Sequence, residues 1–221
     1  MFDGSMPLAY WPLMLLAAYL LGSVPFAQMI ARLKSVDLRT VGTGNIGAGN
    51  VTAQIGKGWG IAAALLDVLK GLVPVYVSRR LGLGPGAAGM VGLSAVVGHN
   101  WSVFMRGRSG RGLATSAGAV VVLDPVLLVW TTGWAVAGWK IGGGLAGFLG
   151  WGLLPIASVA LGRPPTLSLF LLLLAAVLIG RRMQGNLGSS RESYMMWRRA
   201  LYDSDSPIRE FPETVEDPLT L

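Results

Sequence analysis

The sequence predicts an all-α integral membrane protein, a bundle of about seven transmembrane helices with short re-entrant or broken spans. Only 13% of its 221 residues are charged, 52% are hydrophobic, and the mean hydropathy is +0.57. Soluble domains carry about 25% charged residues. So few charges cannot cover the surface of a soluble fold, so we place the apolar segments in lipid.

Seven apolar segments follow one another along the chain. The first has no basic residues ahead of it, so we expect it to be retained and not cleaved as a signal peptide. Most of the segments approach the roughly 20 residues that cross a bilayer. The fourth and fifth are short, and could instead form one span that Pro125 breaks by removing a backbone donor. The segments are residues 7–31, 58–78, 86–105, 112–123, 125–139, 142–161 and 166–181.

Basic residues divide unevenly between the two sides of this bundle. One set of loops and the C-terminal tail hold 14 of the 18 Lys and Arg, the other set holds 3, and Lys70 lies within a span. The positive-inside rule then predicts a multi-pass protein of the cell inner membrane, N-terminus outside and C-terminus cytoplasmic. We therefore attribute the net charge of +7 to membrane topology and to contact with membrane lipid, and we expect no nucleic acid as a partner.

The chain divides into three parts. Residues 1–182 form the transmembrane domain. Residues 183–202 combine Met, Trp and Leu with arginines, which predicts an interfacial amphipathic segment. Residues 203–221 carry six of the eleven acidic residues and three prolines, which predicts a disordered acidic tail.

The stretch VGTGNIGAGN, at residues 41–50, contains the pattern G-x-G-x-x-G, and Asp67 follows it by 20 residues. A dinucleotide site needs this pattern inside a βαβ unit. We reject that interpretation because the loop lies between apolar helices and Asp67 lies inside an apolar run. The glycines can still let backbone N–H groups converge on an anion, although a tight turn between helices would use them equally. The candidate phosphate-binding residues here are Gly42, Gly44, Gly47 and Asn50, with Thr43 and Asn45 as candidate catalytic residues and Arg39 as a secondary candidate.

A second loop, residues 98–118, alternates arginine with glycine and runs into a helix. A helix N-terminus, glycine backbone and guanidinium groups together bind phosphate well. The alternative is a basic loop that contacts anionic headgroups. Both loops face the cytoplasm in the predicted topology, so they can converge on one phosphate site. The candidates here are Arg108, Gly110, Gly112 and Thr115 for phosphate, and Arg111 as a catalytic residue.

Three further residues could take part in chemistry. Asp67 and Lys70 are spaced i, i+3 on one apolar helix, so they share a face and can pair for structure or for function. His99 is the only histidine, and it could be a base, a phosphate donor or a helix-end hydrogen-bonding group. The chain has no cysteine and one histidine, which argues against a thiol nucleophile or a multi-histidine metal site, so we expect no metal.

Six pieces of the sequence, read together, resemble the bacterial acyl-phosphate:glycerol-3-phosphate acyltransferase family. They keep the family's order and spacing over about residues 20–125. The pieces are LLGSVPFAQMIA, VDLRTVGTGNIGAGNV, IGKGWG, LLDVLKGLVPV, VVGHNWSVF and GRSGRGLATSAG.

This resemblance implies a seven-span enzyme without cofactor that transfers an acyl group from acyl phosphate to the 1-hydroxyl of glycerol 3-phosphate, forming lysophosphatidic acid. It places the phosphate-binding loops at residues 42–50 and 108–115. It also implies a functional link to the enzyme that forms acyl phosphate. Acyl phosphate is already activated, so orientation and charge neutralisation can supply much of the rate.

The sequence departs from the family pattern at several positions. Thr43 replaces a serine, Gly49 a threonine, Ala53 an arginine and Arg111 a lysine; Asn186 is the candidate match to a C-terminal asparagine. The alternative hypothesis is therefore a non-catalytic paralogue that binds anionic lipid or a phosphorylated metabolite, and a transporter is a third. The base could be His99 or the substrate phosphate.

Overall fold

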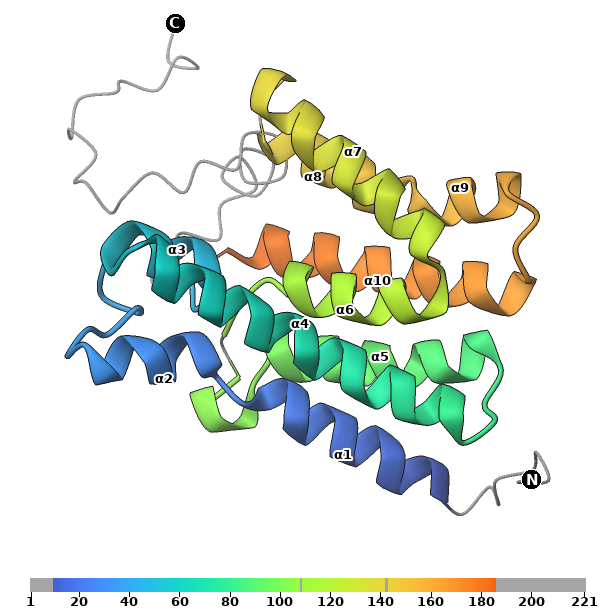
Figure 1. Ribbon diagram of the computed structural model, residues 1–221, viewed down its shortest axis with the longest axis horizontal. Helices are drawn as coiled ribbons and strands as arrows, with labels where there is room; N and C mark the ends of the chain where they lie inside the picture. The colour runs from blue at the N-terminus through green and yellow to red at the C-terminus, as the bar shows by residue number, and fades with distance from the viewer. Residues whose placement is uncertain (1–9, 108, 142, 186–221) are drawn as a thin grey trace, which may run out of the picture.

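The computed structural model describes residues 10–107, 109–141 and 143–185, and all the regular secondary structure in these ranges is helical (Figure 1). The predicted interfacial segment and acidic tail, apart from residues 183–185, lie outside the described residues. The helices are α1 (Trp11–Ser23), α2 (Phe26–Leu33), α3 (Ala48–Gln54), α4 (Lys57–Arg80), α5 (Pro85–Asn100), the 3₁₀ turn η2 (Val103–Met105), α6 (Leu113–Leu123), α7 (Pro125–Ile141), α8 (Gly143–Gly152), α9 (Leu154–Ala160) and α10 (Pro165–Gln184).

Each predicted apolar segment corresponds to one helix or to one broken pair. The first is α1 and α2, interrupted at Val24 and Pro25, and the sixth is α8 and α9, interrupted at Leu153 just before Pro155. Asp124 separates α6 from α7, and Figure 1 shows the chain reversing direction there. The fourth and fifth segments are therefore separate helices and not one interrupted span.

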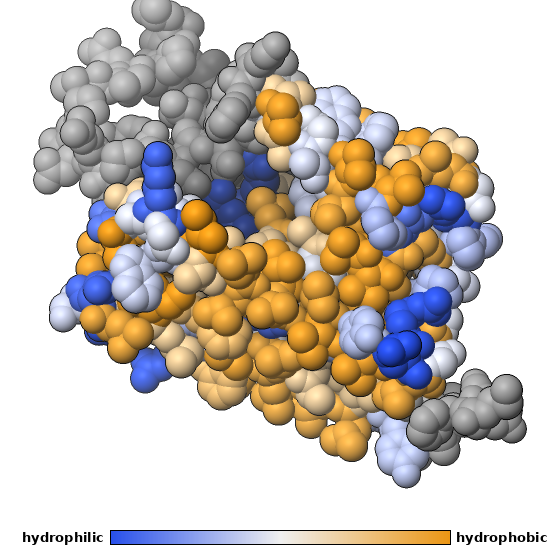
Figure 2. Space-filling model, in the orientation of Figure 1, coloured by the Kyte–Doolittle hydropathy of each residue, from blue (hydrophilic) through white to orange (hydrophobic). Residues whose placement is uncertain are grey.

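Three stretches are long and apolar enough to cross a membrane: Trp11–Leu33, Lys57–Arg80 and Pro165–Gln184. Helix α6 has only 11 residues, which at 1.5 Å per residue rise about 16 Å, half of a hydrocarbon core. The prediction of short or broken spans is thus confirmed. Figure 2 shows apolar residues covering the middle of the visible face and hydrophilic residues gathered toward both ends, as a lipid-facing surface requires.

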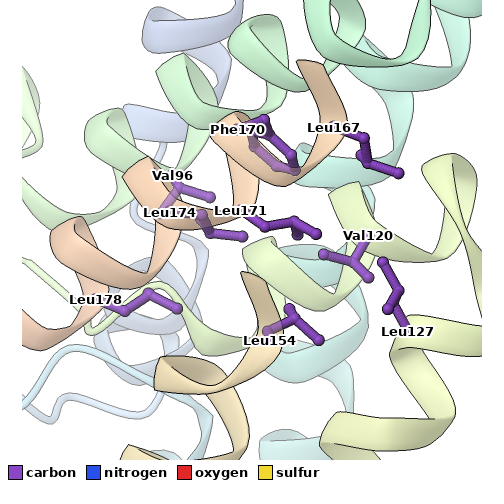
Figure 3. Packing of buried hydrophobic residues seen from close by; sticks show 9 residues of the cluster. All are labelled: Val96, Val120, Leu127, Leu154, Leu167, Phe170, Leu171, Leu174 and Leu178. Atoms are coloured by element: carbon purple, nitrogen blue, oxygen red, sulfur yellow. The ribbon is translucent and has the colours of Figure 1, made fainter. Parts of the chain in front are cut away.

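One core cluster is organised by α10. Leu167, Phe170, Leu171, Leu174 and Leu178 line one side of this helix and are buried. They pack against Val96 of α5, Val120 of α6, Leu127 of α7 and Leu154 of α9 (Figure 3). This cluster ties the C-terminal helices to the centre of the bundle.

Helices α4 and α6 touch backbone to backbone because glycine lines both of them. A Cβ added at Gly118 would lie 2.9 Å from the Val68 carbonyl carbon and closer still to its oxygen, and one at Gly71 would lie 2.8 Å from the Thr115 carbonyl carbon. Small residues allow this close approach in membrane bundles. The packing fixes the start of α6 against the middle of α4.

Both glycine-rich loops lie at the same end of the bundle, on the left of Figure 1, together with α2, α3 and the C-terminal end of α10. The N-terminal end of α1, the α4–α5 turn and the α6–α7 turn lie at the opposite end (Figure 1). The alternating directions of the spans therefore bring together two loops about 60 residues apart in the sequence.

Candidate phosphate site

The first loop is organised by the side chain of Asn50. Its Nδ2 donates to the carbonyl oxygens of Leu38, Val41 and Asn45 at 3.2, 3.1 and 3.1 Å. Its Oδ1 accepts from the backbone N–H of Thr43 at 3.4 Å. Asn50 is buried, so in this structure its amide holds the loop together from inside.

Glycine is required at Gly42 for two reasons. Its φ of +56° is in the left-handed region, and a Cβ there would lie 2.7 Å from Nε2 of Gln54 and closer to Oδ1 of Asn50. The turn that follows is closed by Thr43, whose Oγ1 accepts from the backbone N–H of Asn45 at 3.3 Å. The loop geometry thus depends on the residue types that the sequence analysis singled out.

Asp37 anchors the entrance of this loop. Its carboxylate accepts from Nε2 of Gln28 at 3.0 Å, from Arg32 at 2.9 Å and from Nη2 of Arg39 at 2.6 Å. The hydrogen-bonded Arg39 guanidinium holds the pKa of Asp37 well below its usual range, and the same contact raises the pKa of Arg39. Arg39, a secondary candidate from the sequence, is therefore bound to Asp37.

The second loop lies directly against the first at Gly110. A Cβ added at Gly110 would lie 2.7 Å from Cε1 of His99, closer still to Nε2, and 2.8 Å from the carbonyl oxygen of Ile46. Gly110 and Ser109 are buried. The absence of a side chain at Gly110 thus lets both loops and the histidine meet at one point.

The second loop is also attached to helices α5 and α10. The backbone N–H of Ser109 donates to the carbonyl of Asn100 at 3.2 Å, and Nη2 of Arg181 donates to the carbonyl of Ser109 at 2.9 Å. Gly112, with φ of +77°, precedes the first turn of α6, and a Cβ there would lie 2.6 Å from Oδ1 of Asn100. The loop therefore has a defined path into α6.

Asp67, Lys70 and His99 form a buried cluster beneath this loop. Nζ of Lys70 lies 2.8 Å from Oδ1 of Asp67, which confirms the predicted pairing on one face of α4. Nδ1 of His99, from α5, lies 3.6 Å from the same carboxylate oxygen. Nζ of Lys70 also donates to the carbonyl of Val24 at 3.1 Å, at the break between α1 and α2.

Arg111 lines a pocket between the start of α6, α8 and α10. The pocket is a narrow depression that is partly open to the surface. Its wall joins two arginines to apolar groups: Arg111 and Arg182, with Leu113, Gly147, Trp151, Leu178 and Ile179. Such a lining suits an anion that carries a hydrocarbon chain.

The structure brings most of the sequence candidates together at this end of the bundle. The loop of Gly42, Gly44, Gly47 and Asn50 touches the loop of Gly110 and Gly112 through Ile46, and His99 lies beneath both. Thr115 is buried in α6, where its backbone carbonyl touches Gly71. Arg108 and Asn186 lie outside the described residues, and among the described residues no group of three or more metal-ligating side chains occurs.

Sequence reasoning did not select Arg181 and Arg182 for the site. The sequence analysis assigned both only to the basic C-terminal end, although Arg181 is the last residue of the predicted segment 166–181. Arg181 lies in the last turn of the 20-residue apolar helix α10 and is buried. A charge placed inside the predicted boundary of a span is the signal that could have identified it.

Comparison with known proteins agrees with this architecture. The family model for glycerol-3-phosphate acyltransferase matches residues 12–191. A glycerol-3-phosphate acyltransferase of Thermus thermophilus is 46% identical over 169 residues, covering 72% of this chain and 80% of the relative. Glycerol-3-phosphate acyltransferase 1 of Deinococcus radiodurans is 40% identical over 177 residues, covering 76% and 85%.

Two solved structures are also similar. Both are crystal structures of PlsY, an integral membrane glycerol 3-phosphate acyltransferase, and each match covers 79% of this chain and 88% of the other. The glycerol 3-phosphate form matches with a TM-score of 0.73 and 33% identity, and the lysophosphatidic acid form with 0.71 and 30%. The part of this chain that the structure describes contains no strand, so the rejection of a dinucleotide fold is confirmed. With its sequence matched over most of its length and its helical fold shared, this chain belongs to the glycerol-3-phosphate acyltransferase family.

Proposed function

We propose that this protein transfers an acyl group from acyl phosphate to the 1-hydroxyl of glycerol 3-phosphate, producing lysophosphatidic acid and inorganic phosphate. The observation that carries the proposal is the meeting of two glycine-rich loops at Gly110, directly over His99. The names of the relatives and the glycerol 3-phosphate and lysophosphatidic acid forms of the solved structures support the same reaction.

The acceptor oxygen attacks the acyl carbonyl carbon, and the bond from that carbon to the phosphate oxygen breaks. Inorganic phosphate leaves with the electron pair of that bond, and the acceptor's proton passes to His99 or to a phosphate oxygen of the substrate, the two bases that the sequence offers. The donor is a mixed anhydride, so no covalent enzyme intermediate is needed. The site has to align two anions and neutralise their charge, which are the contributions that orientation and preorganised dipoles make to catalysis.

We assign the loop amides around Gly42, Gly44 and Gly47 to the phosphate of one substrate, held in shape by the internal amide of Asn50. Thr43 and Asn45 sit in the same turn and are assigned to positioning the acceptor. In the second loop, Arg108, Arg111 and the amides of Gly110 and Gly112 are assigned to the other phosphate, with Thr115 in the first turn of α6. Arg111 offers a planar fork where the family has a lysine, which suits two phosphate oxygens.

The pocket beside Arg111 suits the donor. Its two arginines can attract a phosphate, while Trp151, Leu178 and Ile179 can pack against the methylene groups next to it. The chain of acyl phosphate would then continue between α8 and α10 into lipid. Lysophosphatidic acid, the product, has the same amphiphilic form.

We further propose that the protein lies in the cell inner membrane with its N-terminus outside and both loops at the cytoplasmic face. The excess of basic residues in the loops at that end supports this orientation. A cytosolic enzyme that forms acyl phosphate could then deliver the donor to the open loops, which is the functional link we expect.

The test uses purified full-length protein with acyl phosphate and labelled glycerol 3-phosphate, without acyl-CoA or acyl carrier protein. We expect labelled lysophosphatidic acid, and a loss of activity in Arg111→Ala that Arg111→Lys partly restores. Arg80→Ala is the matched control because Arg80 is exposed at the opposite end of the bundle.

Two outcomes would contradict parts of this proposal. Full activity in Arg111→Ala would remove Arg111 from the phosphate site. Tight binding of glycerol 3-phosphate without any product would favour the non-catalytic paralogue, the alternative suggested by Ala53 at the family's arginine position.

A further inference from the structure

Arg181 is a buried cation in the last turn of α10. It is 4% exposed. Leu178, about one turn earlier, belongs to the core cluster around α10 (Figure 3), so this part of the helix is fixed to the bundle. Burying a guanidinium ion costs free energy unless its N–H groups bind acceptors. The acceptors of Arg181 therefore indicate what this buried charge does.

The guanidinium donates to two backbone carbonyls that are far apart in the sequence. Its Nη2 donates to the carbonyl oxygen of Ser109 at 2.9 Å, and its Nη1 donates to that of Gly185 at 2.7 Å. The first bond is buried and joins α10 to the second glycine-rich loop. A hydrogen bond from an ionised donor is roughly twice as strong as one between neutral groups. Arg181 thus holds this loop against the end of a helix that the core has already fixed.

Ser109 is held on its other side by α5. Its backbone N–H donates to the carbonyl oxygen of Asn100 at 3.2 Å, and the residue is 5% exposed. The N–H and the C=O of Ser109 are therefore both bound, the first by the end of α5 and the second by the end of α10.

The bond from Arg181 also determines the direction of the Gly110 amide. A peptide unit is planar and trans, so the C=O of Ser109 and the N–H of Gly110 point in opposite directions. Because the C=O is directed at Arg181, the N–H points away from it. Glycine leaves such a unit free to rotate, and the bound guanidinium removes that freedom. The same bond polarises the peptide unit, which strengthens the N–H as a donor.

The neighbouring arginine has a different location. Arg182 lines the pocket beside Arg111, whereas Arg181 is buried and bound to Ser109. Two consecutive arginines are thus placed differently: Arg182 can touch an anion in the pocket, and Arg181 can act on one only through the loop.

We infer that Arg181 is a positioning residue that directs the Gly110 amide at the phosphate of acyl phosphate. Arg181 fixes the peptide unit between Ser109 and Gly110, directly before Arg111, and so sets the path of the loop that carries both phosphate-binding groups. This inference rests on the proposed function, in which the second loop and the pocket beside Arg111 bind the donor.

The test removes the guanidinium and keeps an unbranched apolar side chain. Arg181→Met loses both bonds, and we expect KM for acyl phosphate to rise about 10-fold or more, as the loss of a hydrogen bond to a charged group predicts. KM for glycerol 3-phosphate should stay near that of the wild type, because the first loop binds it. Arg181→Lys keeps the charge without the planar fork, so its KM for acyl phosphate should rise less.

Hydrogen–deuterium exchange of residues 106–112 gives a second measurement that does not depend on turnover. Inorganic phosphate should slow exchange in this segment of the full-length wild-type protein. In Arg181→Met, exchange without phosphate should be faster, and the same phosphate concentration should slow it less. If Arg181→Met does not fold, both measurements are made on Arg181→Lys.

Arg79→Met is the matched control. Nη1 of Arg79 also donates to a backbone carbonyl, that of Leu83, but in the α4–α5 turn at the opposite end of the bundle (Figure 1). We expect both KM values and the exchange of residues 106–112 to remain those of the wild type.

The two levels of the proposal fail differently. A wild-type protein that makes no lysophosphatidic acid would overturn the proposed function. A wild-type protein that is active, with unchanged KM for acyl phosphate or unchanged loop exchange in the folded Arg181 variant, would overturn the positioning role alone. An equal rise in KM for both substrates would also overturn it, because that result indicates a purely structural role.

Discussion

Gly110→Ala should be among the most damaging single-methyl changes in this protein. Gly110 does not have a positive φ, so alanine is acceptable to the backbone and only the added methyl group matters. That methyl would lie 2.7 Å from Cε1 of His99 and 2.8 Å from the Ile46 carbonyl oxygen, and closer still to Nε2 of His99.

The required displacement can be worked from these distances. Ordinary contact begins near 3.4 Å, so the groups must separate by at least 3.4 − 2.7 = 0.7 Å at Cε1 and 3.4 − 2.8 = 0.6 Å at Ile46, and by more at Nε2. The imidazole or the loop must therefore move by about 1 Å, and a misplacement of that size can cost about 100-fold in rate. This corresponds to about 2.7 kcal/mol of transition-state stabilisation.

The assay is kcat/KM for acyl transfer to glycerol 3-phosphate, with the amount of folded protein measured beside it. Gly49→Ala is the control, because Gly49 lies in the other glycine-rich segment and a Cβ there meets nothing within 4 Å. We expect Gly49→Ala to keep wild-type activity. A Gly110→Ala protein with wild-type kcat/KM would refute the close contact of both loops with His99.

Three further predictions concern the scaffold. Gly118→Ala should destabilise the purified protein by about 1–3 kcal/mol, because the added methyl group would clash with the Val68 carbonyl of α4. The measurement is the thermal unfolding midpoint, and the control is Gly180→Ala, because a Cβ at Gly180 meets nothing within 4 Å. Asn50→Ala leaves the partly buried Thr43 N–H and three carbonyls without their partner. KM for glycerol 3-phosphate should therefore rise by the factor that corresponds to about 1–3 kcal/mol of lost binding free energy, and an unchanged KM would mean that the loop holds its shape without Asn50. The pKa of Asp37 is lowered in the folded state, so the stability that its carboxylate contributes is present above the unfolded pKa of about 3.9 and is lost as pH falls below it. Asp37→Asn should lower thermal stability slightly at pH 7, and the difference from wild type should shrink in acid. A difference that grows in acid would contradict the role given to the Asp37 carboxylate.

Much of the architecture follows from local pattern. Hydropathy located the seven apolar segments because burial in lipid depends on the average over about 20 residues. The spacing of Asp67 and Lys70 predicted their pairing, since i and i+3 share a face on any helix. Glycine marked both loops and arginine marked the second one for the same local reason, because backbone freedom and charge are properties of the residues themselves.

The contacts that build the site were decided by tertiary structure. The meeting of Gly110 with His99 and Ile46, and the bond from Arg181 to the Ser109 carbonyl 72 residues away, depend on how the spans pack. That packing depends on close backbone approach at glycines such as Gly118, which composition alone could not assign to a partner.

The same division applies to individual roles. The sequence by itself indicated that this chain lies in a membrane and that it resembles an acyltransferase family, and it led to the prediction that the two glycine-rich loops bind phosphate. Only the folded chain placed Asn50 inside its loop, bound Arg39 to Asp37 and linked Lys70 to the broken first span. Those roles depend on partners that long-range packing supplies, and a local pattern cannot specify which group will lie opposite a side chain.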